Sequence, residues 1–316
     1  MKKAINLSGA EINAGDYLIE YGANQILSGI DGLEYLGSWS RHSQADAVKE
    51  DIIQFIFGGP MWSSDVFDTR IPHASLKAIP MGVGCLAALD YEKAKLGRRT
   101  ALVLENLKDA PVTTRDFATL DFLRERGVKK AVLGGCPAFL ATYPFDSNIS
   151  ENHFIISDPS WWWNYSHSVK LISSIKRFKP NAKITFLWHR GIIRKTASLK
   201  LNALRVAVNT YLSYMGVRSI DGANKLDIFK TYLTGIHIGF RVHAHVFCRS
   251  NNVPSVLLCE DHRSREMVKV FQDQQNDVSD YNFRDILKEL DTQRDLRSLK
   301  IELKEQTLAA IRSIVK

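Results

Sequence analysis

Residues 183–190 read Lys183-Ile184-Thr185-Phe186-Leu187-Trp188-His189-Arg190, an apolar run of strand length that stops at two polar residues. The next long stretch, 197–215, is amphipathic and predicts a helix. The same order of strand and helix returns twice further on, with strands at 236–240 and 256–259 and helices at 242–249 and 264–274. Strands that alternate with helices are typical of a parallel sheet, so the second half of the chain is predicted to be α/β.

The first half of the chain shows the same alternation. Short apolar runs predict strands at 54–57, 78–84 and 130–135. Between the last two, residues 117–127 predict a helix that Thr114 or Asp116 caps and Gly127 ends. The first half is therefore predicted to form a parallel sheet of its own.

We expect an α/β protein with two Rossmann-like domains that face each other across a cleft, followed by C-terminal helices. A loop-like region at 147–160 places the boundary near residue 150, with an N-terminal domain at 1–150 and a C-terminal domain at 151–316. Further helices are predicted at 163–178 and 224–233 and a strand at 217–220, and the tail at 282–316 predicts one or two amphipathic helices of the second domain. In such sheets ligands bind at the carboxyl ends of the strands.

The composition is that of an ordinary globular protein, since the chain has 316 residues, of which 45% are hydrophobic and 24% charged. It excludes a disordered chain, a coiled coil and a fibrous repeat. Lys and Arg outnumber Asp and Glu by 42 to 34, and the net charge of +8 favours anionic partners. The basic residues are scattered, so we expect no nucleic-acid partner. The sequence shows neither an apolar run of bilayer length nor the apolar core of a signal peptide, and we expect a cytoplasmic protein.

The sequence predicts no metal site. The four cysteines, Cys85, Cys136, Cys248 and Cys259, lack the spacing of zinc ligands and are expected to be buried thiols. The pair His243 and His245 has no third ligand at a suitable spacing.

Polar residues gather after three of the predicted strands in the second half. His189 and Arg190 follow the first strand, and Arg241, His243 and His245 follow the second. The third strand is followed by Glu260, Asp261, His262 and Arg263. A guanidinium binds carboxylates and phosphates, and an imidazole can move protons, so these strand ends are candidates for an anion site. The helix after Arg241 adds the field of its N-terminus. The alternative is that these groups cap helices or face solvent. Residues two apart on a helix point to different faces, and of the two later histidines we favour His243 over His245.

The first half offers weaker candidates. Asp16 lies in a turn that opens a helix, where it either contacts substrate or caps the helix. Gly58 and Gly59 follow a strand and can let a ligand approach the backbone closely. The residues Trp161 to Trp163 indicate an interdomain wedge or a sugar-stacking surface, although core packing is the more common fate of such side chains.

Taken in order, these motifs resemble the polysaccharide pyruvyl transferase family over roughly residues 10–275. The segments that carry the resemblance are Asn13-Ala14-Gly15-Asp16, Gly58-Gly59, Thr114-Arg115-Asp116, Gly239-Phe240-Arg241-Val242-His243, Asn252-Val253-Pro254-Ser255-Val256 and Asp261-His262-Arg263-Ser264-Arg265-Glu266. The stretch from Gly239 to Glu266 is the strongest of them.

The resemblance implies a GT-B-like fold and a reaction. Members of the family transfer pyruvate, as a ketal, from phosphoenolpyruvate to a sugar of a cell-surface polysaccharide or its lipid-linked precursor. The first domain would then lie on the acceptor side and the second on the donor side. By the family pattern Arg241 and His243 line the phosphoenolpyruvate site, and Arg190 matches a strand-end arginine of the family.

The residue types agree with this chemistry. Arginines can hold the carboxylate and the phosphate of the donor, so neither a metal nor a separate cofactor is expected. His243 can serve as a general acid or base, while Asp16 or Asp116 can orient the acceptor or act as its base. The positive net charge also suits a lipid-linked acceptor, with peripheral contact to the inner face of a membrane.

Two other readings remain open. The same fold could belong to a nucleotide-sugar glycosyltransferase, in which Glu260 or Glu266 would bind a ribose. It could also belong to a glycan- or nucleic-acid-binding protein without activity, because fold does not dictate function.

Overall fold

A computed structural model describes residues 1–10, 13–40, 49, 51–59, 63, 65–69, 71–85, 96–195, 197–222 and 226–316. The chain forms two compact units. The first contains Met1–Ala10, Asp16–Thr142 and Arg297–Lys316, and the second contains Glu11–Gly15 and Tyr143–Leu296. The sequence placed the boundary at 150 and the whole tail in the second domain, whereas in the structure the last helix belongs to the first unit.

The first unit is built on parallel strands. Four of them pair in the order β2-β1-β3-β4, and they are β1 (Lys2–Ser8), β2 (Leu33–Ser40), β3 (Ile52–Phe57) and β4 (Ile79–Met81). A bridge between Val83 and Thr114 leads on to the parallel pair β5 (Val112–Thr114) and β6 (Ala131–Leu133). The strand order reverses between β1 and β3, which is the switch point of a doubly wound sheet.

Helices cover both faces of the first unit's strands. On one face, α2 (Val66–Thr69), α3 (Arg98–Leu107) and α4 (Phe117–Glu125) bury a core that includes Ile5, Leu7 and Ile56. The helices α1 (Ala14–Ser28), α5 (Pro137–Leu140) and α12 (Arg297–Val315) form another group. Close backbone contact joins α1 and α5, since a Cβ on Gly22 of α1 would lie 2.2 Å from the carbonyl oxygen of Pro137.

The second unit holds a six-stranded parallel sheet in the order β12-β11-β10-β7-β8-β9. The strands are β7 (Ser150–Ser157), β8 (Lys183–Trp188), β9 (Arg218–Asp221), β10 (Gly235–Gly239), β11 (Ser255–Cys259) and β12 (Asn276–Asp277). Counted from β7, this is the order 3-2-1-4-5-6 of the Rossmann fold, with its switch point between β7 and β10. Ser157 pairs with Gly239, so the two strands end side by side.

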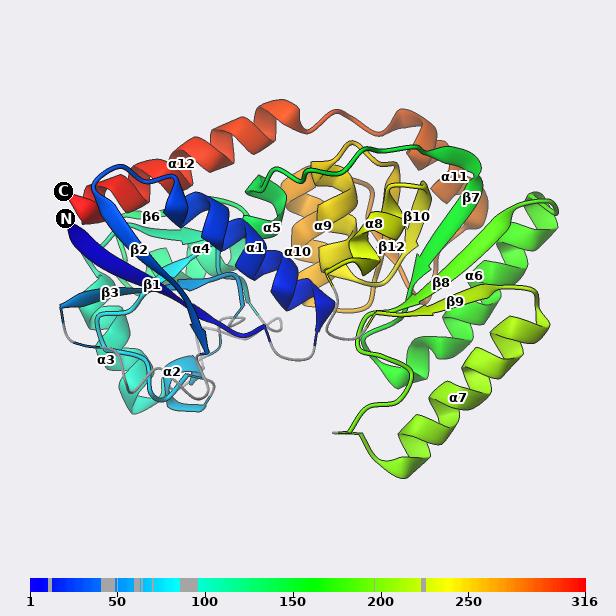
Figure 1. Ribbon diagram of the computed structural model, residues 1–316, viewed down its shortest axis with the longest axis horizontal. Coiled ribbons are helices and arrows are strands. Elements are labelled where there is room, and N and C mark those ends of the chain that lie inside the picture. The colour runs from blue at the N-terminus through cyan, green and yellow to red at the C-terminus, as the bar shows by residue number, and fades with distance from the viewer. Residues whose placement is uncertain are drawn as a thin grey trace. The chain divides into compact units, whose positions relative to one another are not determined.

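Two layers of helices enclose this sheet (Figure 1). The helices α6 (Tyr165–Phe178), α7 (Leu199–Tyr214) and α11 (Phe283–Thr292) share one core with the sheet, in which Phe186 and Trp188 are among the largest side chains. The helices α8 (Ile228–Tyr232), α9 (Val242–Ser250) and α10 (His262–Phe271) belong to the other layer. Successive residues of β11 face opposite sides of the sheet. Leu258 packs in the core shared with α6, α7 and α11, while Leu257 and Cys259 pack with Val268 of α10.

Most of the predicted elements are confirmed, with shifts of a few residues at their ends. The loop expected at 147–160 is wrong, because that region contains β7, a central strand of the second sheet. Its first three residues are polar and exposed, and only the remainder is buried. A strand that leaves the core halfway carries too short an apolar run for the sequence pattern to identify it.

The four cysteines are buried free thiols, as predicted. In the described part of the chain, no helix combines the length and apolar character needed to cross a membrane.

Candidate active site at the carboxyl ends of the second sheet

An ion pair lies at the switch point of the second sheet. Asp158 directly follows β7, and Arg241 follows β10 after one intervening residue. The Nε of Arg241 donates to Oδ1 of Asp158 at 2.8 Å and its Nη2 donates to Oδ2 at 2.7 Å. Nη2 also donates to the carbonyl of Pro159, while Nη1 contacts Ser160 Oγ at 3.3 Å. Nη1 is therefore the guanidinium nitrogen that the carboxylate does not engage.

Burial strengthens the electrostatic interaction between Asp158 and Arg241. Asp158 is fully buried and Arg241 is 6% exposed. Burial alone would raise the pKa of the Asp158 carboxyl, but the charge and hydrogen bonds of Arg241 outweigh it and hold that pKa below its usual range. Burial likewise works against the charged guanidinium, and the carboxylate reverses the effect, so the pKa of Arg241 is raised. Both groups therefore stay charged at neutral pH.

Backbone geometry fixes the start of α9. The hydroxyl of Ser157 accepts hydrogen bonds from the backbone N–H groups of Phe240 and Arg241 at 2.9 and 3.1 Å. A Cβ on Gly239 would lie 2.3 Å from that hydroxyl oxygen, so only glycine leaves room for the contact. The glycine that precedes the Arg-x-His motif thus has a packing reason.

Two further arginines belong to the same electrostatic cluster, and the sequence analysis missed both. Arg205 of α7 is 2% exposed, and its Nε donates to the Tyr165 hydroxyl at 2.8 Å. Arg194 lies in the loop after β8, where its backbone N–H and carbonyl both bond to the Asn202 side chain. Burial, followed by the charges of Arg205 and Arg241, lowers the pKa of Arg194.

The cluster has three guanidinium groups and two carboxylates. The charges of Arg205, Arg241 and Asp158 act on Arg194, and Glu260 acts on Arg241 as well as Asp158. The Nη1 atom of Arg205 and the Nε atom of Arg194 are shielded from solvent and have no acceptor among the described residues. Buried guanidinium donors normally find acceptors, so the arrangement suits an anion.

His189 is a core histidine. Its Nε2 forms a 2.6 Å hydrogen bond with the Tyr232 hydroxyl, and its ring packs edge-on against Phe229. Its backbone N–H donates to Oδ1 of Asp158. Burial, opposed by the charge of Asp158, lowers the pKa of the imidazole to about 3. His189 is therefore neutral at physiological pH and supports the ion pair through its backbone.

This depressed pKa predicts a pH dependence of stability. The unfolded chain protonates His189 near pH 6.5 but the folded chain only near pH 3, so the unfolded state binds more protons in that window. The contribution is complete above about pH 6.5 and is lost on acidification, by up to about 1.4 kcal/mol per pH unit. Urea unfolding measures the free energy of unfolding from pH 8 to pH 4.5. This free energy should fall less steeply with decreasing pH in His189→Asn than in the wild type, and parallel profiles would contradict the prediction.

His243 and His245 point to different sides of α9, as their spacing predicted. His245 is fully buried, with Nδ1 bonded to Ser255 Oγ and Nε2 to Asp273. Ser255 also contacts His237, which reaches back to Ser157. This buried chain of hydrogen bonds ends at Ser157, at the switch point of the sheet. It leaves His245 no exposed atom for substrate.

His243 lies half-buried beside the segment that opens α1. A Cβ built on Gly15 would lie 2.3 Å from His243 Nδ1, so the glycine allows the imidazole to pack directly on the backbone. The backbone N–H of Ala14 donates to the carbonyl of His189 at 3.4 Å. Two motifs that are far apart in the sequence therefore meet in the second unit. Arg190 follows His189 in the turn after β8 and is half-buried.

The remaining predicted residues lie in the first unit. Asp116 is buried and caps α4, with Oδ1 accepting from the Thr119 N–H at 2.8 Å and Oδ2 from the Cys85 N–H at 3.3 Å. The first of these bonds is a structural cap, and Asp116 also pairs with Arg115 at 3.8 Å. Gly58 follows β3 with a φ of +67°, and a Cβ there would lie 2.5 Å from Ile19. Asp16 lies in the first turn of α1, and Gly59 is half-buried after Gly58.

The acidic residues considered for a ribose are engaged elsewhere. Glu260 accepts from the backbone N–H of Ser160 and from the Asn164 amide, both at 2.8 Å. Glu266 is buried in α10 and pairs with Lys269. Among the described residues, no group of three or more His, Cys, Asp or Glu side chains is placed to hold a metal ion.

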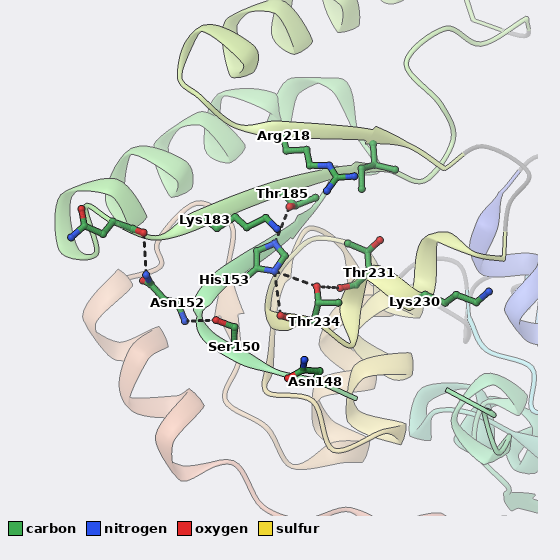
Figure 2. A pocket seen from close by; sticks show the side chains of 12 residues that line it. Asn148, Ser150, Asn152, His153, Lys183, Thr185, Arg218, Lys230, Thr231 and Thr234 are labelled. Carbon is green, nitrogen blue, oxygen red and sulfur yellow. Dashed lines mark hydrogen bonds between the residues drawn. The ribbon is translucent and has the colours of Figure 1, made fainter. Parts of the chain in front are cut away.

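A cavity of about 690 Å³ lies at the opposite, amino-terminal edge of the second sheet. Figure 2 shows His153 at its centre, with Lys183 and Arg218 on neighbouring strands. His153 bonds to Thr185 Oγ1 at 2.9 Å. None of the predicted site residues lines this cavity, so its size does not mark the site that the arginines form.

The missed residues gave only weak signals in the sequence. Asp158-Pro159 comes just after the apolar run Phe154–Ile156, but three apolar residues are too few to identify a strand end. Arg205 stands on a helix whose spacing also turns Leu212 toward the core. A single arginine on such a face is buried only when the tertiary structure supplies partners, and the sequence names none of them.

The fold is similar to solved structures of GT-B-like enzymes. The UDP-GlcNAc 2-epimerase from Neisseria meningitidis, bound to UDP-GlcNAc, matches with a TM-score of 0.61 at 10% identity over 100% of both chains. The UDP-GlcNAc 2-epimerase from Methanocaldococcus jannaschii matches with a TM-score of 0.58 at 10% identity over 99% of both chains. The pneumococcal O-GlcNAc transferase, in complex with UDP and GlcNAc, has a TM-score of 0.50 at 11% identity over 85% of this chain and 57% of that one. These likenesses show a GT-B-like α/β fold.

The sequence comparison identifies the family. No curated protein sequence matches the chain. The family model for polysaccharide pyruvyl transferase matches residues 13–262, which include the Gly15 segment, Asp158, the three arginines and His243. The chain therefore belongs to the polysaccharide pyruvyl transferase family.

Proposed function

We propose that the protein transfers pyruvate, as a ketal, from phosphoenolpyruvate to a sugar of a cell-surface polysaccharide or of its lipid-linked precursor. The observation that carries the proposal is the cluster of Arg194, Arg205 and Arg241 around Asp158, with two buried N–H donors that lack an acceptor among the described residues. Phosphoenolpyruvate carries a phosphate and a carboxylate, and paired arginines match both groups.

The residues divide the binding task. Arg194 and Arg205 present guanidinium donors to the anionic groups of the donor substrate. Arg241 is held in place by Asp158 and offers Nη1, the nitrogen that the carboxylate leaves over. Because these groups are fixed before substrate arrives, they stabilise charge that develops on the leaving phosphate without reorganising.

The reaction requires a proton at the methylene carbon of phosphoenolpyruvate. Protonation converts this carbon to a methyl group and gives C2 cationic character, and one sugar hydroxyl then adds to C2 and loses its proton. Departure of inorganic phosphate and attack by a second hydroxyl, which also loses its proton, complete the ketal. His243 lies at the same strand edge and is proposed as the group that gives or takes a proton. Asp16 remains a proposed base for the acceptor. Arg190 is proposed as a further contact to phosphoenolpyruvate.

The acceptor and the location are proposed from charge. A net charge of +8 fits an anionic donor and an acceptor carried on a lipid pyrophosphate. We propose a cytoplasmic enzyme with peripheral contact to the inner face of the membrane, with no metal and no separate cofactor in the reaction.

The assay is the release of phosphate from phosphoenolpyruvate in the presence of a panel of glycans, with mass analysis of the glycan for an added pyruvate. Arg194→Gln and Arg205→Lys are each expected to raise the KM for phosphoenolpyruvate about 10- to 150-fold, the effect of losing one charge-assisted hydrogen bond. Calorimetric titration with phosphoenolpyruvate alone should show the same loss.

Arg218→Gln is the matched control, because Arg218 lines the cavity at the opposite edge of the sheet. It should leave the KM for phosphoenolpyruvate unchanged. Wild-type affinity in both Arg194→Gln and Arg205→Lys would reject the arginine cluster as the donor site. Turnover of a UDP- or GDP-sugar without response to phosphoenolpyruvate would favour the glycosyltransferase alternative.

A further inference from the structure

Three consecutive tryptophans form an exposed aromatic cluster, which we call the tryptophan platform (Trp161–Trp163). Their exposures are 42%, 55% and 53%. Trp161 and Trp163 are stacked, with ring centroids 4.9 Å apart and an interplanar angle of 11°. Trp162 meets Trp163 edge to face. The structure therefore excludes burial in the core, and exposed clusters of large aromatic side chains usually mark binding surfaces.

The platform directly adjoins the proposed donor site. It follows β7 in the same loop that supplies the partners of Arg241, namely Asp158, Pro159 and Ser160. This loop lies at the carboxyl end of the central strand, where open α/β sheets bind their ligands. Only Pro159 and Ser160 separate the platform from Asp158 along the chain, so a molecule bound on the platform lies beside the loop that holds Arg241.

The platform is held rigidly. Both oxygens of Glu260 bind the loop on its two sides, one through the Ser160 backbone N–H and the other through the Asn164 amide. The Asn164 N–H donates to the carbonyl of Trp161 at 3.1 Å, which closes a short 3-10 turn over Trp162–Asn164. Rings that are fixed before binding lose little conformational entropy when a ligand packs on them.

The local charge argues for a neutral, hydroxyl-bearing ligand. No lysine or arginine occurs from Glu151 to Val169. Arg241, the basic group that contacts Ser160 beside the platform, is already paired with Asp158, and the carboxylate of Glu260 also binds this loop. A surface that binds anionic lipid normally carries basic residues beside its aromatic ones. A pyranose ring instead offers a C–H face to an aromatic ring and hydroxyls to neighbouring polar groups.

We propose that Trp161–Trp163 form the stacking platform for a hexose ring of the acceptor glycan, an inference that rests on the proposed pyruvyl transfer. The ring packs on the exposed indole faces, and its hydroxyls point toward the loop that holds Arg241. The platform is a specificity element for the acceptor and takes no part in binding phosphoenolpyruvate.

The test separates the two substrates. Trp161→Ala and Trp163→Ala are each expected to raise the KM for the acceptor glycan at least tenfold while the KM for phosphoenolpyruvate stays within twofold. Trp163→Phe should recover most of the acceptor affinity, because it restores a flat aromatic face. Tyr214→Ala, which removes an exposed aromatic ring at the end of α7, is the matched control and should change neither constant.

Binding is measured without activity by quenching of tryptophan fluorescence with soluble oligomers of glucose, galactose, mannose and N-acetylglucosamine. At least one oligomer should bind the wild type and bind Trp163→Ala at least tenfold more weakly. Failure of every oligomer to bind the wild type, or equal binding by wild type and variant, overturns the platform. The same holds if the variants instead lose binding to vesicles with anionic lipid, or change oligomeric state in sedimentation.

The two proposals fail differently. Oligosaccharide binding that depends on the platform, in a protein that releases no phosphate from phosphoenolpyruvate with any acceptor, contradicts the proposed function and supports the glycan site. Phosphate release with acceptor kinetics that ignore Trp161 and Trp163 contradicts the platform and leaves the proposed function standing.

Discussion

Arg241→Ala is expected to lower the free energy of unfolding by about 3–5 kcal/mol, the usual cost of leaving a buried charge without its partner. The fully buried Asp158 carboxylate would keep the backbone N–H of His189 as its other described donor and lose two guanidinium bonds. Thermal or urea unfolding measures the loss. The same variant should release no phosphate from phosphoenolpyruvate, but loss of activity in a destabilised chain does not identify a substrate contact.

A double-mutant cycle separates the two roles of Arg241. Asp158→Asn combined with Arg241→Met removes both charges, keeps an acceptor for the His189 N–H and fills the space of the arginine stem. This variant should regain much of the stability that Arg241→Ala loses, yet remain inactive. Stability equal to the wild type in Arg241→Ala alone would show that the ion pair does not hold the switch point together, and activity in the double variant would remove Arg241 from the site.

Gly15→Ala is expected to reduce turnover at least about 100-fold while the protein stays folded, since misplacement of a catalytic group by about 1 Å has that effect. The new methyl group would lie 2.3 Å from Nδ1 and 2.8 Å from Cγ of His243, so the imidazole has to move. Alanine is also the better helix former, by up to about 1 kcal/mol in a helix interior, which offsets part of the crowding in the first turn of α1. The measurement is kcat for phosphate release together with the unfolding midpoint.

Gly29→Ala supplies the control for the second prediction. Gly29 follows the end of α1, and a Cβ there makes only ordinary contacts, the nearest at 3.4 Å. It should leave kcat unchanged. His243→Gln should reduce kcat about 100- to 10,000-fold if the imidazole transfers a proton. A Gly15→Ala enzyme with normal kcat beside an inactive His243→Gln enzyme would mean that the imidazole tolerates displacement, and normal turnover in both would exclude His243 from the chemistry.

The strand ends of the candidate site were the part whose position in the fold the sequence predicted best. Arg241 follows an apolar run that ends in glycine, and parallel strands finish at one edge, so its place in the second unit required only a pattern of strands and helices. His243 and His245 were also separated correctly, because helical periodicity alone turns residues two apart to different faces.

Partners of those residues were not predictable in the same way. Asp158 follows a strand whose first three residues are exposed, so the pattern of apolar residues was too short to reveal it. Arg194 and Arg205 come from a loop and from a helix of the other layer, and they approach the ion pair only after that helix packs on the sheet. Glu260, considered for a ribose, instead fixes the loop of the tryptophan platform.

The sequence by itself determined the fold class, the parallel sheets, the strand edge at which the candidate site residues lie and, through the motifs from Gly239 to Glu266, the family. These follow from periodicity and local backbone preference, which neighbouring residues encode. Only the tertiary structure decided that Arg241 is bound to Asp158, that His189 is a neutral core residue, that Gly15 supports His243 and that the tryptophans remain exposed. Burial and charge pairing depend on atoms brought together from distant segments, and no local pattern contains that information.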